Sequence, residues 1–132
     1  MKAVLIDKVT KSEDVKISEV AIPSVKPGWL LIQIKAFGIN HSEKLLRSFE
    51  IEEDYIKKPV IPGIECVGEI VDPSDTDLKK GDRVAALMGG MGRSFNGSYA
   101  EYALLHIPDR TLFLSAIKDF YQVIEFHADR LD

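Results

Sequence analysis

Hydrophobic and polar residues alternate in short runs along the first hundred residues, and glycine or proline separates the runs. Alternation with this period is typical of β-strands that turn one face toward a core. One run begins with Leu30 and Leu31, so that its start is apolar on both faces, and Ile32, Ile34 and Ala36 then continue on one side. The pattern predicts strands over residues 3–6, 15–17, 29–37, 64–71, 83–87 and 98–105.

One segment between these strands has a helical period. Leu45, Leu46 and Phe49 follow Ser42 at spacings that suit one face of a short helix, and Ser42 is placed to cap it. Prolines at positions 59 and 62 exclude helix before the next strand, and the glycine-rich residues 89–97 predict a loop. Many short strands with little helix and no long βαβ alternation predict a mainly β fold with short helices, in the form of an irregular β-barrel.

The end of the chain predicts an amphipathic helix, which Ser115 is placed to cap. Its apolar positions recur at helical spacing: Ile117, Phe120, Tyr121, Ile124 and Ala128. This face must pack on the barrel or, as the alternative, on a partner, including a second copy in a homodimer. We therefore expect one domain over residues 1–108 and an atypical helical tail over residues 109–132.

Composition restricts the classes of function. The 132 residues, 45% of them hydrophobic, suffice for one globular core. The formal charge is −4 and no basic stripe is present, which argues against a nucleic-acid binder. No apolar run approaches the ~20 residues of a membrane span, and the N-terminal run is too short for a secretory signal. We expect a cytoplasmic protein without membrane or nucleic-acid partners.

Few residues are placed to hold a metal or a nucleotide phosphate. The single cysteine, Cys66, excludes an internal disulfide and is expected as a small buried side chain. His41, His106 and His127 are far apart in the sequence, so we expect no metal site. The segment Gly90–Phe95 begins like a dinucleotide fingerprint but lacks its third glycine and leads into a strand.

Polar groups that can exchange protons or donate hydrogen bonds gather at the junction between the predicted strand and helix. Asn40, His41 and Ser42 offer an amide, an imidazole and a hydroxyl in sequence. The residues alone leave two interpretations open, a helix cap or a functional site.

Three segments, Gly38–Glu43, Pro62–Val71 and Lys80–Val84, resemble the catalytic domain of the medium-chain dehydrogenase/reductases. Zinc-dependent members read Gly-x-Cys-His at the first segment and Gly-His-Glu at the second. Here Asn40 and Ile64 stand at the two ligand positions. The resemblance covers roughly residues 1–108 and implies the zinc-independent, quinone-oxidoreductase-like branch, with its GroES-like barrel.

The resemblance also implies roles for single residues. Asn40 would lie beside the nicotinamide and the substrate, and Ser42 would contact the substrate oxygen, so both are expected to be catalytic. Asn40, His41 and Arg47 are expected to bind the cofactor, NAD(P)H with NADPH favoured. The substrate would be a small carbonyl compound or quinone. The segment Gly97–Tyr102 matches a structural stretch that closes the barrel of the family.

The chain departs from the family after Leu105, where a glycine-rich nucleotide-binding unit would follow. Residues 111–132 are too few for a βαβ unit of ~30 residues and contain no glycine. We therefore expect a truncated or partial NAD(P)H-dependent oxidoreductase that binds no cofactor by itself and is not active alone. The alternative is a standalone binding or regulatory module on the same barrel. A chaperone role is a third interpretation, which the lack of a strongly hydrophobic loop disfavours.

Overall fold

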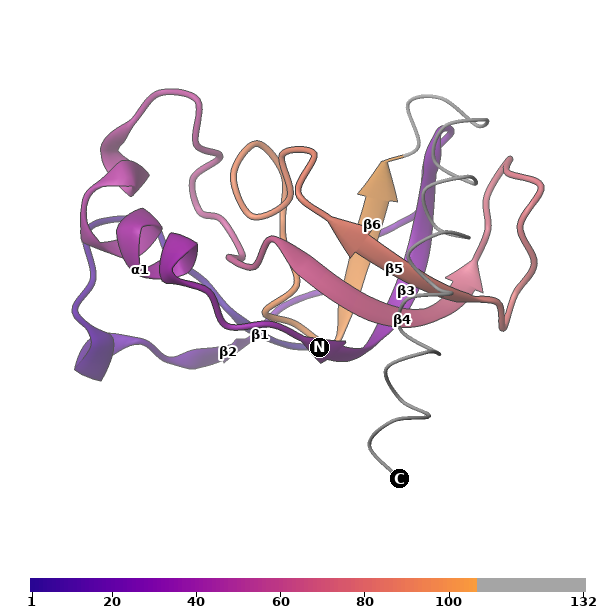
Figure 1. Cartoon of the computed structure of the whole chain (residues 1–132), viewed down its shortest axis with the longest axis horizontal. Helices are drawn as coiled ribbons and strands as arrows, with labels where there is room; N and C mark the ends of the chain where they lie inside the picture. Colours follow the sequence, from indigo (N-terminus) through magenta and orange to yellow (C-terminus); the bar gives the residue numbers. More distant parts are fainter. Residues whose placement is uncertain (107–132) are drawn as a thin grey trace, which may run out of the picture.

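The computed structural model describes residues 1–106, which fold mainly as β-structure with one α-helix. Figure 1 shows the helix at one end of the molecule and most of the strands toward the other. The strands are β1 (Lys2–Val4), β2 (Ile17–Glu19), β3 (Trp29–Phe37), β4 (Glu65–Asp72), β5 (Arg83–Leu87) and β6 (Tyr102–His106). The helices are α1 (His41–Ser48) and two short 3₁₀ turns, η1 (Ser12–Asp14) and η2 (Glu50–Glu52).

A four-stranded antiparallel sheet in the order β5-β4-β3-β6 forms the centre of the fold. The predicted strands 29–37 and 83–87 coincide with β3 and β5. The start of β3 is buried on both faces, as its apolar pattern predicts, because Leu30, Leu31 and Ile32 are at most 8% exposed. The core under this sheet joins residues from β3, β4, β5 and β6, chiefly Leu30, Ile32, Ile70, Val84 and Leu105.

A second, smaller core lies where α1 and η2 meet the N-terminal segment. Leu46 of α1 and Ile51 of η2 are fully buried there and pack with Ile6, Ile56 and Val60. An isolated antiparallel bridge between Ile6 and Val60 holds this corner together. The short sheet of β1 and β2 lies beside it and is joined to the later chain by a bridge from Ala3 to Ala100.

The helix prediction needs two corrections. The cap of α1 is Asn40, whose backbone is extended, and Ser42 is the second residue inside the helix. Of the predicted apolar face only Leu46 is buried, whereas Leu45 and Phe49 are 38% and 57% exposed. Phe49 has φ −159°, outside the helical region, which turns its side chain away from the row that Leu46 occupies.

The last predicted strand is shorter than its pattern indicates, because β6 begins at Tyr102 and not at Ser98. The preceding residues instead form single backbone hydrogen bonds to other elements. The Val4 N–H donates to the Tyr99 carbonyl, and the Ile34 N–H donates to that of Glu101. This segment thus links β1 to the four-stranded sheet, while closure into a barrel stays a prediction. The predicted tail helix lies outside the described residues.

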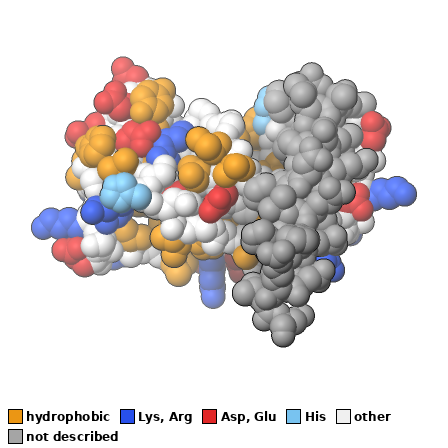
Figure 2. Space-filling model, in the orientation of Figure 1, with side chains coloured by type: hydrophobic (Ala, Val, Ile, Leu, Met, Phe, Trp, Pro, Cys, Tyr) orange, Lys and Arg blue, Asp and Glu red, His pale blue; other side chains and the backbone are white. Residues whose placement is uncertain are grey.

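The surface at the helical end carries charges of both signs. Figure 2 shows acidic, basic and hydrophobic side chains at this end of the molecule. Glu52, Glu53 and Asp54 are exposed there, beside Tyr55, and so are Lys44 and Lys58. No helix within residues 1–106 is long and apolar enough to cross a bilayer.

Gly63 is a glycine at which both the backbone conformation and close contacts exclude a side chain. Its φ is +104°, and a Cβ there would overlap the Ser98 hydroxyl and lie 2.8 Å from Tyr99 Cδ1. Gly81 has a similar φ of +90° but open space around it. We expect Gly81→Ala to lower the free energy of unfolding by about 1–2 kcal/mol through backbone strain alone, and Gly63→Ala by about 2–5 kcal/mol because overpacking is added.

Urea unfolding of both variants measures the difference. Because the two glycines share the left-handed conformation, equal losses would contradict the close contact between Gly63 and the segment of Ser98 and Tyr99.

Candidate functional site

A hollow of about 290 Å³ lies between the N-terminal segment and α1. We call it the Asn40 pocket. The N-terminal segment contributes Val4, Ile6, Ser12 and Val15, the α1 region contributes Ile39, Asn40, Glu43, Lys44 and Arg47, and Pro62 and Tyr99 complete the lining. Two of the predicted site residues, Asn40 and Arg47, thus share one hollow.

Asn40 is held at the junction of β3 and α1 by its contact with Glu65. The Asn40 Nδ2 donates to Glu65 Oε1 over 3.2 Å. A glycine at position 38 makes room for this carboxylate, since a Cβ there would overlap Glu65 Oε1. One amide hydrogen of Asn40 is therefore fixed on Glu65, and the direction of the second follows from the planarity of the amide group.

Glu43 fixes the backbone on both sides of the pocket. Its side chain is only 6% exposed. Its Oε2 accepts the Asn40 N–H at 2.8 Å, and its Oε1 accepts the Ile64 N–H at 3.2 Å. A carboxylate accepts hydrogen bonds with both oxygens, so this one buried side chain satisfies two partly buried donors that are far apart in sequence.

Arg47 closes the side of the pocket toward the N-terminal segment. It is half-buried, and its Nη1 donates to the Thr10 carbonyl at 3.1 Å. The Thr10 N–H in turn donates to the Arg47 carbonyl at 2.9 Å. Because only one guanidinium nitrogen is used in this way, Arg47 keeps donors for a ligand.

Tyr99 carries a buried hydroxyl that makes no hydrogen bond to any described residue. Burial, followed by the negative charges of Glu43 and Glu65, raises the pKa of this phenol to about 12. The hydroxyl therefore stays protonated at neutral pH. A buried donor without a partner is uncommon and marks a place where a ligand atom or a water can be accommodated.

The other two predicted site residues lie outside this pocket. The Ser42 hydroxyl accepts a hydrogen bond from Arg93 Nη2 at 2.8 Å, and Arg93 is also paired with Glu50 at 2.8 Å. His41 is exposed. The structure therefore brings Asn40 and Arg47 together and directs Ser42 toward the glycine-rich loop.

The two positions that hold zinc in zinc-dependent relatives have no metal-binding set here. Ile64 provides no ligand side chain, and the two carboxylates beside Asn40, Glu65 and Glu43, both accept hydrogen bonds from it. Residues 1–106 contain no group of three potential ligands at metal distance. Cys66 is buried, and burial followed by the charge of Glu65 raises its thiol pKa to about 12, which leaves it a weak ligand and nucleophile.

Sequence reasoning missed three residues of this region. Glu43 had a signal, because Asn40 and Glu43 have the spacing of a capping box. Arg93 and Tyr99 had none, since their contacts join segments that are far apart in the chain. Chemically, the pocket offers neutral and cationic hydrogen-bond donors on apolar walls, which suits a small ligand with a carbonyl oxygen.

Residues 26–114 match the family described as the alcohol dehydrogenase GroES-like domain. The chain is 34% identical to human quinone oxidoreductase over 110 residues, which is 79% of this chain and 31% of that protein. It is 33% identical to an alcohol dehydrogenase of Geobacillus stearothermophilus over 150 residues, covering 91% of this chain and 44% of the relative. The chain thus spans less than half the length of these curated relatives.

Solved structures show the same fold. The quinone oxidoreductase of Coxiella burnetii superposes with a TM-score of 0.69 at 22% identity, over 80% of this chain and 34% of that one. The human synaptic vesicle membrane protein VAT-1 homolog-like protein superposes with a TM-score of 0.66 at 26% identity, over 86% of this chain and 37% of that one. These matches confirm the predicted resemblance and a GroES-like fold.

The two hydrogen bonds accepted by Glu43 predict a stability effect. Glu43→Gln replaces one acceptor oxygen by a donor, so that either the Asn40 or the Ile64 N–H loses its partner. We expect a loss of about 1–3 kcal/mol in the free energy of unfolding, measured in urea. The control is Glu69→Gln, because Glu69 is 44% exposed and lies 3.8 Å from Lys35, a pair expected to contribute less than about 1 kcal/mol. Equal effects of the two variants would refute the role of Glu43.

The raised pKa of Tyr99 predicts a loss of stability in alkali. A group whose pKa is higher in the folded state stabilises the fold below its unfolded value of about 10, and this contribution disappears as the pH rises to about 12. The stability of the native chain relative to Tyr99→Phe should therefore fall as the pH rises across this window. Urea unfolding at several pH values measures it, and a pH-independent difference would contradict the burial of the hydroxyl.

Proposed function

The chain belongs to the family of alcohol dehydrogenase GroES-like domains, and from this membership we propose that it forms the substrate-side wall of a reductase site. The reaction would be the NAD(P)H-dependent, zinc-independent reduction of a small quinone or other carbonyl compound. Quinone oxidoreductases and alcohol dehydrogenases among its relatives support this class of reaction. The single observation that carries the proposal is the Asn40 pocket, where a fixed amide and Arg47 face apolar walls.

A nicotinamide fits the pocket in part. Its carboxamide needs both a donor and an acceptor, and Asn40 is of that type, with Arg47 available beside it. A reduced nicotinamide, when bound, supplies a hydride to the substrate carbonyl. NADPH is the favoured form on the resemblance alone.

The phosphates of a dinucleotide have no matching cradle within residues 1–106. The loop from Gly90 leads to a turn, and its Arg93 is already used by Glu50, by the Gly92 carbonyl and by Ser42. Phosphate binding in this family would need a nucleotide-binding domain besides the part described. We therefore propose that residues 1–106 contribute the substrate side and do not hold the cofactor alone.

The chain's own residues would act by positioning and by hydrogen bonding. Asn40 would donate its second amide hydrogen to the substrate oxygen, where negative charge develops during reduction. The buried apolar side chains of the pocket, such as Ile6 and Pro62, would exclude water from that oxygen. Ser42 and His41 stay predictions as site residues. The Ser42 hydroxyl faces Arg93 and His41 is exposed, and neither residue lines the Asn40 pocket.

Zinc does not fit these residues, and no step is assigned to it. Ile64 has no donor atom, and the Asn40 amide and the Glu65 carboxylate are joined to each other. A substrate oxygen in this pocket would therefore be polarised by hydrogen bonds and not by a metal ion.

Titration of the ¹⁵N-labelled chain with cyclohex-2-enone tests the proposal. We expect saturable amide shifts at the residues of the Asn40 pocket. Asn40→Ala should weaken binding about 3- to 10-fold, the effect of one hydrogen bond. The control variant is Ser48→Ala, on the exposed end of α1, and a metal chelator should change nothing.

Parallel titration with NADPH separates the remaining interpretations. No binding up to about 10 mM NADPH, with enone binding intact, is the expected result. Micromolar NADPH binding would contradict the partial site. Absence of any enone effect at the Asn40 pocket would refute the reductase wall and favour a standalone binding module.

A further inference from the structure

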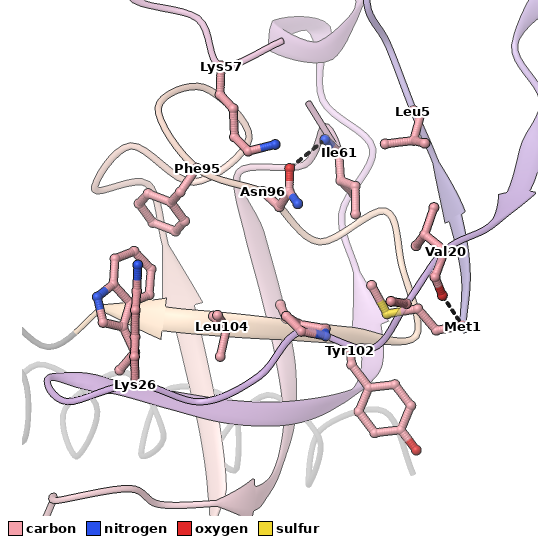
Figure 3. Close-up of a pocket in the computed structure, with 14 residues that line it drawn as sticks. Met1, Leu5, Val20, Lys26, Lys57, Ile61, Phe95, Asn96, Tyr102 and Leu104 are labelled. Carbon is pink, nitrogen blue, oxygen red and sulfur yellow. Dashed lines mark hydrogen bonds between the residues drawn. The ribbon is translucent and has the colours of Figure 1, made fainter. Parts of the chain in front are cut away.

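A second hollow, which we call the Trp29 pocket, lies apart from the Asn40 pocket and shares no lining residue with it. Its volume is about 250 Å³, compared with the ~150 Å³ of a protein cavity that accepts benzene. It is bounded by the N-terminal strand region, the segment around residues 20–29, Ile61, the end of the glycine-rich loop and β6. Figure 3 shows Phe95 and Lys26 on one side of it and Leu5 and Met1 on the other.

The walls of the Trp29 pocket are apolar and partly aromatic. Trp29 and Phe95 meet edge to face, with ring centroids 5.1 Å apart and planes at 89°. The His106 ring also lies against Trp29, with centroids 4.7 Å apart and planes at 38°. Trp29 and Phe95 both line the pocket, so they offer aromatic surface to a third ring. Leu5, Val20 and Leu104 supply aliphatic surface. Such a space accepts a single flat ring.

The polar groups on this pocket are almost all donors or cations. Lys26 Nζ lies 4.6 Å from the centroid of the Trp29 ring, and Lys57 Nζ donates one hydrogen to the Pro59 carbonyl at 2.7 Å. Neither ammonium group forms an ion pair with any carboxylate among the described residues. None of the residues that line the pocket is acidic. In a chain of net charge −4, this is a local positive site.

Asn96 adds a donor of fixed direction. Its Oδ1 accepts the Ile61 N–H at 3.1 Å, which orients the amide and turns Nδ2 away from that bond. In Figure 3 the nitrogen of Asn96 points toward the space between Phe95 and Val20. The amino group of Met1 contributes less, because it donates to the Val20 carbonyl and lies 3.6 Å from Glu19.

We propose that the Trp29 pocket binds a small aromatic carboxylate, with the ring against Trp29 and Phe95 and the carboxylate near Lys26, Lys57 and Asn96. A carboxylate accepts hydrogen bonds with both oxygens, and no acidic side chain of the lining competes with it for these donors. A neutral aromatic molecule would fill the same volume but leave the cations without a counter-charge. The proposal is independent of the reductase function, since the two pockets have no lining residue in common.

Trp29 is the only tryptophan of the chain, so its fluorescence reports on this pocket alone. Titration with benzoate should give a saturable change of emission, with a dissociation constant on the order of 1 mM for a ligand of this size. Benzamide, which has the same shape without the charge, should bind at least about fivefold more weakly.

Two lysine variants and a matched control localise the effect. Lys26→Gln and Lys57→Gln should each weaken benzoate binding about 3- to 10-fold relative to the native chain, and the double variant should weaken it further. Each titration is referenced to the emission of the same variant without ligand. Because both lysines are exposed, the variants should fold. Lys80→Gln, which removes an exposed lysine elsewhere, should leave binding unchanged.

The proposal is overturned by any of four results, the first three of which concern the ligand and the double variant. These are no saturable change up to about 20 mM benzoate, equal binding of benzamide, or equal affinities of the native chain and the double variant. A loss with Lys80→Gln as large as with Lys57→Gln would also overturn it, because net charge and not the pocket would then determine binding.

Discussion

The hydrogen bonds accepted by Glu43 are the interaction on which the candidate site depends. One buried carboxylate receives the N–H groups of Asn40, at the start of α1, and of Ile64, just before β4. Neither donor is part of the ladder of the four-stranded sheet. An N–H that loses its partner inside a fold destabilises it by about 1–3 kcal/mol, so one side chain stabilises both the junction of β3 with α1 and the entry into β4.

This constraint also fixes the direction of the side chains in the pocket. With the Asn40 backbone held by Glu43, the Asn40 amide is free only to rotate about its side-chain bonds, and Glu65 then selects one orientation. A donor that is already oriented loses little entropy when a ligand binds, which is the physical content of preorganisation. The arrangement needs Gly38, because any larger residue would displace Glu65. The pocket therefore depends on backbone contacts as much as on its polar groups.

Local patterns in the sequence predicted local structure, and they were weakest for contacts between distant segments. The strands 29–37 and 83–87 follow directly from alternation and from punctuation by glycine and proline. The helix cap was assigned to Ser42 because hydroxyl caps are common, yet the extended backbone and the reach of Glu43 place the cap at Asn40. Ser42 instead contacts Arg93, 51 positions away, because the glycine-rich loop brings Arg93 to it. The conformation of that loop cannot be predicted from the spacing of hydrophobic residues.

The same limit applies to the candidate site. Asn40 and Arg47 were found through the resemblance, and their shared pocket follows from their spacing of seven residues, which is nearly two turns of helix and places both on one face. Tyr99 was not found, because its position beside Glu43 results from tertiary contacts. Its N–H donates to the Pro62 carbonyl at 3.0 Å, and the Ser98 N–H donates to that of Gly63 at 3.3 Å. A residue brought in by such pairing has no local signature.

The segment from Ile61 to Ile64 explains why two separate pockets can coexist in so small a fold. Consecutive residues of an extended chain point to opposite sides, and Ile61 lines the Trp29 pocket while Pro62 lines the Asn40 pocket. The backbone between them is held from both sides, by Asn96 at the Ile61 N–H and by Glu43 at the Ile64 N–H. A wall fixed at both ends cannot shift toward one pocket without breaking a buried hydrogen bond. The two pockets therefore share a stretch of backbone but no side chain. A substitution in the lining of one pocket thus leaves the lining of the other pocket unchanged.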